Sequence, residues 1–258
     1  MAFLFIYKYT IPRLTDFVSM LVCVYKTLTK YMKDSKIKKE HAKQNIKLAV
    51  DNCIFTIKDG KLCVLLIKMK DKLQGHWALP GGLVNNNETL DSAAKRILKT
   101  QTSVSDVYLE QLYTFGDVKR DPFARVISTA YFALVPPKTN NIKTSAKYSD
   151  VRWIPVKKLP GLAYDHDKIA KYAKQRLADK ISYTNAVWSL LPTKFTLTDL
   201  QKVYEIILGK VIDKRNFRKK ILALDIIHPT SETKIKGAHR PAKLYEFSST
   251  KPKIVEIV

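Results

Sequence analysis

A glycine-rich turn followed by an amphipathic helix constrains this chain more than any other feature of its sequence. The turn reads Gly75-His76-Trp77-Ala78-Leu79-Pro80-Gly81-Gly82. Glycine takes positive φ without steric cost, so we expect the Gly81-Gly82 pair to form a tight backbone turn. From Thr89 onward the apolar residues recur at helical spacing, which predicts a helix with Glu88 beside its positive N-terminal end. These apolar residues are Leu90, Ala93, Ala94, Ile97 and Leu98.

Residues 82–104 resemble the signature of the Nudix hydrolases, whose glutamates hold Mg²⁺ against a pyrophosphate and activate water. The residues in register with the signature are Gly82, Glu88, Arg96, Leu98 and Val104. The three later glutamates are replaced by Ile97, Thr100 and Gln101, and the second glycine by Ser103. Thr100 and Gln101 carry no charge, so the resemblance implies a Nudix frame with no catalytic residues, no metal and no cofactor. An ordinary amphipathic helix after a glycine turn is the alternative.

Size and charge set broader limits. The 258 residues suit one or two domains with a core of ordinary size. The net charge of +23 favours a polyanionic partner, but the excess is spread along the whole chain and supports nucleic-acid binding only weakly. The three cysteines form no CxxC or Cys/His cluster, which favours a reducing, cytoplasmic setting without structural zinc.

The N-terminal part, residues 1–45, is predicted to be an extension and linker of unknown role. Its most apolar stretch, residues 17–25, is shorter than the roughly 18 residues that a membrane span requires, so we expect no membrane partner. Residues 33–43 are Lys-rich and fit a solvated helix or linker.

Residues 46–180 are predicted to form the Nudix-like domain. The apolar runs 46–57 and 62–69 flank Asp59-Gly60, which is a strong hairpin signal. Strands that flank helices and are joined by hairpins indicate an α+β fold, here an α/β/α sandwich with a mixed sheet, and not a doubly wound sheet. The other elements expected are strands over 107–115, 125–135 and 151–155 and a helix over 167–180.

Residues 183–250 are predicted to form a separate domain. A helix with Thr198 as its N-cap and Gln201 at the capping-box position ends at Gly209. A second helix follows, capped by Asp213. Helix, short turn, helix and β-hairpin is the element order of a winged helix-turn-helix. The last three elements are the helix 214–224 and strands 226–230 and 244–247, with a basic loop over 231–240.

Basic residues crowd the start and exposed side of the second helix. Arginine and asparagine at the front of such a helix can reach base edges, and lysines there and on the wing can neutralise phosphates. The same pattern fits a structural helical hairpin with a solvated basic face. The DNA-binding residues predicted are Thr198, Lys214, Arg215, Asn216, Arg218, Lys219, Lys234, Lys236 and Arg240.

Taken together, the two parts resemble the Nudix-related transcriptional regulators of the NrtR type. That resemblance implies a homodimeric repressor that binds double-stranded DNA and senses a small nucleotide or sugar. Many members respond to ADP-ribose and control NAD-related genes, and relatives control sugar catabolism. Family-like stretches are residues 114–122, 162–166, 190–192, 195–197, 213–219 and 240–245.

A Nudix cleft suits ADP-ribose because its frame surrounds a diphosphate linked to a nucleoside. Arg120 and Arg125 are expected to pair with phosphate oxygens, and Trp77 or Phe123 to contact the base or ribose. The neighbouring Asp165-His166 is expected to cap or pack and not to be a catalytic pair. The ligand-binding residues predicted are Trp77, Gly81, Gly82, Glu88, Arg96, Arg120, Phe123 and Arg125.

Two other functions remain open. A pyrophosphohydrolase of nucleoside diphosphate derivatives would need substitute metal ligands, such as Asp106, Glu110, Asp117 or Asp121. A sensor that acts through protein contacts would use the basic tail as a dimerisation module.

Overall fold

The computed structural model describes residues 14–34, 45–70, 73–137, 142–235, 241–249 and 253–255. The chain divides into two compact units, residues 1–46 and 47–258. The first contains the helix α1 (Leu14–Asp34), which lies in the segment predicted to be an extension of unknown role. Most of the predicted 33–43 segment lies outside the described residues. No helix in the described part of the chain is long and apolar enough to cross a bilayer.

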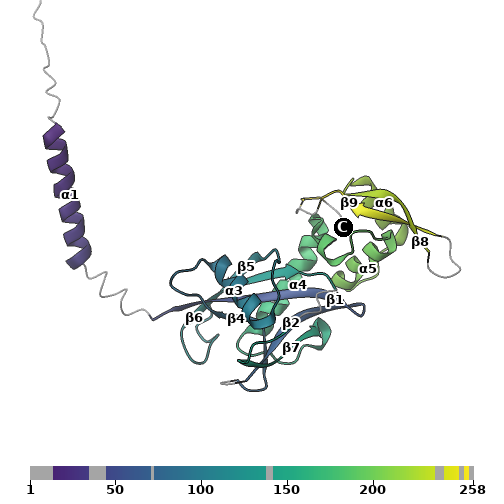
Figure 1. Cartoon of the computed structure of the whole chain (residues 1–258), viewed down its shortest axis with the longest axis horizontal. Coiled ribbons are helices and arrows are strands. Elements are labelled where there is room, and N and C mark those ends of the chain that lie inside the picture. The colour runs from purple at the N-terminus through teal and green to yellow at the C-terminus, as the bar shows by residue number, and fades with distance from the viewer. Residues whose placement is uncertain are drawn as a thin grey trace, which may run out of the picture. The chain divides into compact units, whose positions relative to one another are not determined.

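The second unit is built on a seven-stranded mixed sheet (Figure 1). The strand order is β3-β2-β1-β6-β5, with β4 also on β1 and β7 also on β2. β1 and β6 run parallel, and the other strand pairs are antiparallel. The strands are β1 (Lys47–Lys58), β2 (Lys61–Met69), β3 (Trp77–Ala78), β4 (Gly81–Leu83), β5 (Glu110–Phe115), β6 (Val126–Leu134) and β7 (Tyr148–Pro155).

Helices cover both faces of this sheet, as the predicted sandwich requires. On β1, Val50 packs against α3 (Leu90–Thr102), while Cys53 and Phe55 belong to the cluster that includes α4 (His166–Tyr183). Because successive strand residues point to opposite faces, a strand covered on both sides reads as one continuous apolar run. The expected α/β/α arrangement is therefore confirmed.

The predicted segments agree with the observed elements apart from their ends. Asp59 and Gly60 both have positive φ, 50° and 67°, as the predicted β1–β2 turn requires. The strand expected over 107–115 begins only at Glu110, where its pairing with Phe132 of β6 starts. α4 runs to Tyr183 and therefore crosses the predicted domain boundary at residues 180–183.

The C-terminal domain has the predicted winged-helix order. The short helix η2 (Ala186–Leu190) leads into α5 (Leu197–Leu208), and Gly209 ends α5 with φ 70°. Asp213 accepts a hydrogen bond from the amide of Asn216 (2.8 Å) and caps α6 (Lys214–Ala223). The wing consists of the antiparallel strands β8 (Ile227–Lys234) and β9 (Ala242–Phe247).

The predicted cap of α5 was wrong by two residues. Thr196 is the N-cap, and its hydroxyl accepts from the Asp199 amide (3.1 Å) while the Asp199 carboxylate accepts from the Thr196 amide (3.1 Å). Aspartate thus completes the reciprocal cap that glutamate or glutamine usually forms. Gln201 instead donates to the Ile212 carbonyl (3.0 Å), and Thr198 is exposed in the first turn.

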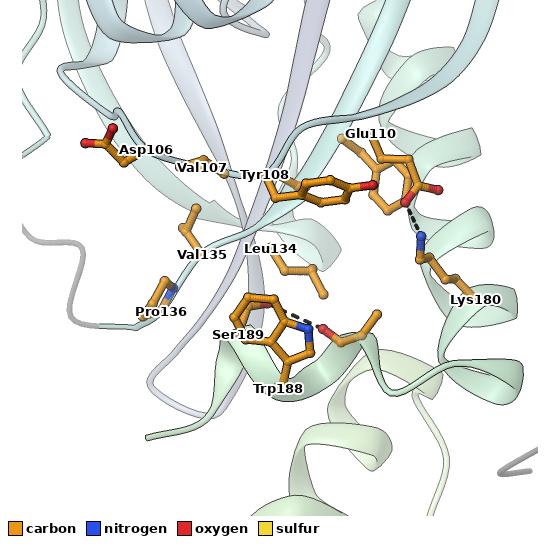
Figure 2. Close-up of a pocket in the computed structure, with 13 residues that line it drawn as sticks. Asp106, Val107, Tyr108, Glu110, Leu134, Val135, Pro136, Lys180, Trp188 and Ser189 are labelled. Carbon is orange, nitrogen blue, oxygen red and sulfur yellow. Dashed lines mark hydrogen bonds and ion pairs between the residues drawn. The ribbon is translucent and has the colours of Figure 1, made fainter. Parts of the chain in front are cut away.

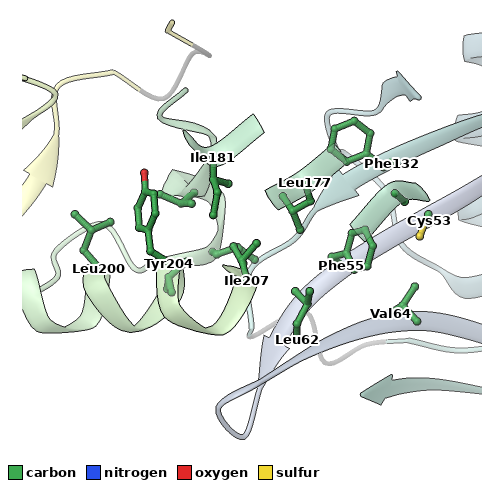
Figure 3. Packing of buried hydrophobic residues seen from close by; sticks show 14 of the residues in the cluster. Cys53, Phe55, Leu62, Val64, Phe132, Leu177, Ile181, Leu200, Tyr204 and Ile207 are labelled. Carbon is green, nitrogen blue, oxygen red and sulfur yellow. The ribbon is translucent and has the colours of Figure 1, made fainter. Parts of the chain in front are cut away.

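The two domains of the second unit share one hydrophobic core (Figure 3). Leu200, Tyr204 and Ile207 of α5 are almost fully buried in the cluster that holds Phe55 and Leu177 of the Nudix sheet and α4. Burying an aliphatic side chain of this size stabilises a fold by about 1.5–3 kcal/mol. A displacement of α5 relative to the sheet therefore disrupts packing in both domains.

Candidate effector cleft and DNA-binding surface

A glycine is needed at position 81 because the carboxylate of Asp51 lies close to its Cα, and not because its backbone conformation is unusual. Neither Gly81 nor Gly82 has positive φ, so the turn predicted from this pair was wrong. Gly81 pairs with Asp51 across β4 and β1, and a Cβ at Gly81 would lie 2.0 Å from Asp51 Oδ1. Any side chain at this position collides with a buried carboxylate.

Replacing Gly81 with alanine is expected to lower the free energy of unfolding by about 1–3 kcal/mol, because overpacking forces the strand or Asp51 to move. Gly116→Ala is the matched control, since a Cβ there meets nothing within 4 Å. Urea denaturation of both variants measures the difference. Equal stability of the two variants would show that Gly81 is not needed for this approach.

Gln101 connects α3 to the same glycine. Its amide nitrogen donates to the Gly81 carbonyl (2.8 Å), and its amide oxygen accepts from the Gly81 N–H (3.1 Å). The hydroxyl of Thr100 donates to the Ile97 carbonyl (3.2 Å). Two positions that carry carboxylates in an active Nudix box therefore hold neutral groups that bond to the backbone, one of them through an N–H donor. These residues do not fit a Mg²⁺ ion.

The alternative metal ligands are engaged separately from one another. Glu110 forms an ion pair with Lys180, and Asp117 lies 3.4 Å from Lys168 Nζ. Asp106 accepts from Ser105 (2.9 Å), and Asp121 accepts from the Phe123 amide (2.7 Å). Within the described ranges, no group of three or more His, Cys, Asp or Glu residues is placed to hold a metal ion.

The two candidate ligand residues Glu88 and Arg96 bind each other. Arg96 Nε donates to Glu88 Oε2 (2.8 Å) and Arg96 Nη2 to the Leu83 carbonyl (3.1 Å). Glu88 also accepts from the Asn85 amide (2.7 Å). The hydrogen bonds from Arg96 and Asn85 lower the pKa of Glu88 to about 2, so it stays ionised. This pair joins the loop after β4 to the outer face of α3.

A buried polar cluster lies beside Gly81, and the sequence reasoning missed its centre, Asp51. Arg120 Nη2 donates to Asp51 Oδ2 (3.0 Å) and to Asp165 Oδ1 (2.7 Å), and its Nε donates to Asp165 Oδ2 (3.1 Å). Ser128 donates to Asp51 Oδ2 (2.6 Å), and His166 Nε2 lies 3.3 Å from Asp51 Oδ1. The side chains of Arg120, Asp51 and Asp165 are only 4–6% exposed.

This cluster changes the interpretation of three predicted residues. Arg120, expected to meet a phosphate, is buried and directs its Nε and Nη2 at Asp51 and Asp165. Asp165, expected to cap or pack, stands at the N-cap of α4 without a side-chain cap hydrogen bond and accepts from Arg120 instead. His166 Nδ1 accepts from the Leu79 amide (3.0 Å), which leaves Nε2 facing Asp51. The sequence contained one signal for Asp51, namely an aspartate inside an apolar run. A carboxylate buried in such a run requires polar or charged partners.

Asp51 is expected to make stability depend on pH. Burial raises its pKa, but the hydrogen bonds from His166 and Ser128 and the charge of Arg120 outweigh burial and hold the pKa at about 2. A depressed folded-state pKa contributes stability above the unfolded value of about 3.9, and this is lost as pH falls toward 2. We expect Asp51→Asn to flatten the fall in unfolding free energy between about pH 4 and pH 2, by about 2 kcal/mol. Parallel pH profiles for the two proteins would contradict this.

The remaining cleft candidates, Trp77, Phe123 and Arg125, lie at well-separated positions around the sheet. Trp77 sits on the edge strand β3, with Lys68 Nζ 5.9 Å and the Arg152 guanidinium 6.0 Å from its ring centre. Arg125 lies just before β6 and donates to the carbonyls of Gly116 (3.0 Å) and Asp117 (3.1 Å), which closes the β5–β6 loop. Phe123, in that loop, is 50% exposed. Strands β2 and β1 separate β3 from β6 in the sheet.

A hollow of about 230 Å³ lies between the β5–β6 pair and η2, outside the predicted cleft (Figure 2). Tyr108 and Trp188 face it from opposite sides, and Lys180 and Glu110 form an ion pair at one end. It adjoins the link between the two domains, and no sequence motif pointed to it.

The winged helix presents most of the predicted DNA-binding residues to solvent. On α6, Phe217 and Ile221 are buried, while the basic side and the start of the helix are exposed. Arg218 is an exception, because it is half-buried and its Nη2 donates to the Thr198 hydroxyl (3.1 Å). The exposed residues of this set are Thr198, Lys214, Arg215, Asn216, Lys219 and Lys234.

The wing is partly described. Lys234 Nζ lies 3.5 Å from Asp199, and Lys194 forms an ion pair with Glu232. These contacts fix β8 against the start of α5. Lys236 and Arg240, also predicted to bind DNA, lie outside the described residues.

Comparisons with known families agree with this architecture. A NUDIX domain model matches residues 47–177, and a model of the NrtR DNA-binding winged helix domain matches residues 187–247. The chain is 37% identical over 207 residues to a protein of Acinetobacter baylyi named as an ADPR responsive transcriptional repressor, covering 78% of this chain and 82% of that relative.

Two further relatives are similar. The crystal structure of Shewanella oneidensis NrtR complexed with a 27mer DNA is 33% identical with a TM-score of 0.67, covering 78% of this chain and 93% of that chain. An ADP-ribose pyrophosphatase of Methanocaldococcus jannaschii is 32% identical over 143 residues, covering 55% of this chain and 81% of that relative. The degenerate Nudix frame, the winged helix that follows it and these similarities show that the chain belongs to the NrtR family of Nudix-related transcriptional regulators.

Proposed function

We propose that this protein is a transcriptional repressor that binds double-stranded DNA through its winged helix and senses ADP-ribose through its Nudix domain. The observation that carries this proposal is the pairing of two features in one chain. Gln101 bonds to Gly81 where a metal-binding carboxylate would stand, and α6 exposes Arg215 and Lys219 to solvent. The first feature gives a Nudix domain that binds its ligand without cleaving it. The second gives a basic helix that can bind a DNA duplex.

The effector assignment rests on the relatives. The A. baylyi repressor is named for its response to ADPR, and the M. jannaschii relative is named for acting on ADP-ribose. In this chain we propose that the ligand lies along the Gly81 loop and the β5–β6 loop. Arg125, Trp77 and Phe123 are the proposed contacts, while Glu88 and Arg96 hold the loop in place. Arg120 does not contact the ligand in this proposal but holds Asp51, which lies beside Gly81.

Regulation requires two dimer geometries that ADP-ribose binds with different affinities. We propose a homodimer whose two α6 helices match half-sites about 34 Å apart in one of the geometries and not in the other. The three cysteines are unpaired, which is compatible with action in the reducing cytoplasm, where the operator DNA is found.

An electrophoretic mobility shift on the chain's own promoter region, titrated with ADP-ribose, tests the proposal. We expect a specific complex with a Kd of about 10⁻⁸ M or tighter, and a change in affinity of about 5- to 150-fold at saturating ADP-ribose. If no specific complex forms in low salt, the repressor function is refuted. If DNA affinity is indifferent to ADP-ribose, only the effector assignment fails.

Hydrolysis of ADP-ribose is the second candidate function, favoured by the similarity to a pyrophosphatase. The neutral groups at positions 100 and 101 remove charge that a metal-assisted reaction needs, which costs several kcal/mol of transition-state stabilisation. We expect no appreciable Mg²⁺-dependent release of AMP by the purified protein. Robust turnover would replace the repressor proposal with the enzymatic one.

A further inference from the structure

A cavity of about 650 Å³ lies between the Nudix domain and the winged helix, away from the Gly81 loop. The β1–β2 turn, η1 (Val156–Lys158) and α4 form one side of it, and α5 with the turn after it forms the other. Figure 1 shows α5 beside the end of the β1–β2 hairpin. The volume falls within the usual range of small-molecule sites, about 300–1,000 Å³.

Lysine is the commonest residue type in the lining. Six of the fifteen lining residues are lysines, compared with 46 lysines and arginines among the 258 residues of the whole chain. All six are exposed, and none lies within ion-pair distance of a carboxylate in the described part of the chain. They are Lys61, Lys157, Lys158, Lys174, Lys202 and Lys210.

The one acidic residue of the lining is already satisfied. Glu205 accepts from the Ile212 amide (3.0 Å) and from the Gln201 side chain (3.0 Å). It therefore holds the turn after α5, and its single negative charge, which interacts with Lys202, leaves five of the six lysine charges of the lining uncompensated. Like charges gathered around a hollow repel each other, and an anion placed among them relieves this repulsion.

Apolar side chains line the space between the lysines. Leu62 and Val156 contribute from the Nudix side, and Ile206 and Val211 from the winged-helix side. A ligand for this site therefore combines several negative charges with a compact body. DNA fits less well, because the predicted DNA-reading residues lie on α6 and the wing, whereas this cavity lies between α5 and the Nudix domain.

We propose that this interdomain cavity is a second ligand site, distinct from the Nudix cleft, that binds a phosphate chain such as that of a nucleoside triphosphate or inorganic tripolyphosphate. Lysines from both domains approach the same ligand, so binding joins α4 to α5 across the domain boundary. Under the proposed function, such a ligand also changes DNA affinity, because it binds one of the two proposed dimer geometries more tightly than the other.

Isothermal titration calorimetry of the full chain without DNA tests the site at about 0.15 M salt, where exposed charges beyond ~8 Å are screened. The probes are ATP, tripolyphosphate and adenosine. We expect saturable binding of tripolyphosphate and ATP and none of adenosine. Absence of saturable binding by both phosphate compounds overturns the proposal. Binding of ATP without binding of tripolyphosphate also overturns it, because the proposed Nudix cleft can itself accept a nucleotide.

Paired charge reversals locate the site. Lys174→Glu with Lys202→Glu places two carboxylates in the cavity from α4 and α5, and we expect at least a tenfold loss of affinity. Lys99→Glu with Lys171→Glu is the control, since both lysines are exposed and unpaired and neither lines the cavity. An equal loss of affinity in both double variants would mean that the ligand is attracted by the overall positive charge of the protein, and this would refute the site. Thermal unfolding of both variants confirms that each is folded. Because no DNA is present, failure here leaves the repressor proposal untouched.

Discussion

Replacing Arg120 with alanine is expected to lower the free energy of unfolding by about 3–5 kcal/mol, because it leaves the buried carboxylates Asp51 and Asp165 without their shared cation. Both lie within 3.0 Å of the Arg120 guanidinium, and all three side chains are almost inaccessible to solvent. Urea denaturation at neutral pH measures the loss. A loss of this size is a large part of the total stability of an ordinary domain.

Lys168→Ala serves as the control, because it breaks an exposed ion pair with Asp117. We expect that change to leave the free energy of unfolding nearly unchanged, because water screens an exposed ion pair. Should Arg120→Ala not fold, Arg120→Met can be compared with Arg120→Met/Asp165→Asn. The second variant is expected to be the more stable of the two, because Asp165→Asn removes one of the two buried carboxylates that have lost their cation. If Arg120→Ala costs no more than Lys168→Ala, the cluster is not the internal support described above.

Replacing both Arg215 and Lys219 with alanine is expected to weaken operator binding on the order of 100-fold, because a base-reading contact is worth about 1–3 kcal/mol and a phosphate contact adds to it. Both side chains are exposed on α6. Affinity measured as a function of salt separates the two roles. Arg215→Ala is expected to reduce the preference for the operator, whereas Lys219→Ala weakens all sequences alike and lowers the salt slope by about one.

Lys99→Ala on α3 is the matched control for this experiment, and DNA affinity is expected to change less than twofold. Arg218→Ala is less informative, because Arg218 donates to Thr198 and its loss also affects the α5–α6 contact. Undiminished promoter binding by the double variant would favour the third possibility, in which the basic C-terminal domain mediates protein contacts.

Element order and fold class were largely readable from sequence. The length and apolar, β-branched character of the runs predicted β1, β2 and β6, and Asp59-Gly60 predicted the turn between β1 and β2. Helical spacing after Thr89 predicted α3, and Gly209 and Asp213 marked the end of α5 and the start of α6. Each of these signals is local, because it depends on backbone conformation or on which face of a single element is buried.

Local signals failed where two patterns overlapped. The sequence pattern predicted Thr198 with Gln201 as the cap, because glutamine is the consensus residue at the capping-box position, whereas the residues that form the cap are Thr196 and Asp199. The structure uses this pair, because Gln201 is needed to reach Ile212 across the turn to α6. That requirement depends on the position of α6, which the residues around the cap do not encode.

The sequence alone determined the loss of charge at positions 100 and 101, the basic front of α6 and the order of the two domains, since each depends only on residue identity and spacing. Tertiary structure alone decided why Gly81 has no side chain, why Arg120 faces inward and which lysines meet between α4, α5 and the β1–β2 turn. These features join residues up to 149 positions apart, such as Lys61 and Lys210, and burial and charge act between them only after the sheet and helices have packed.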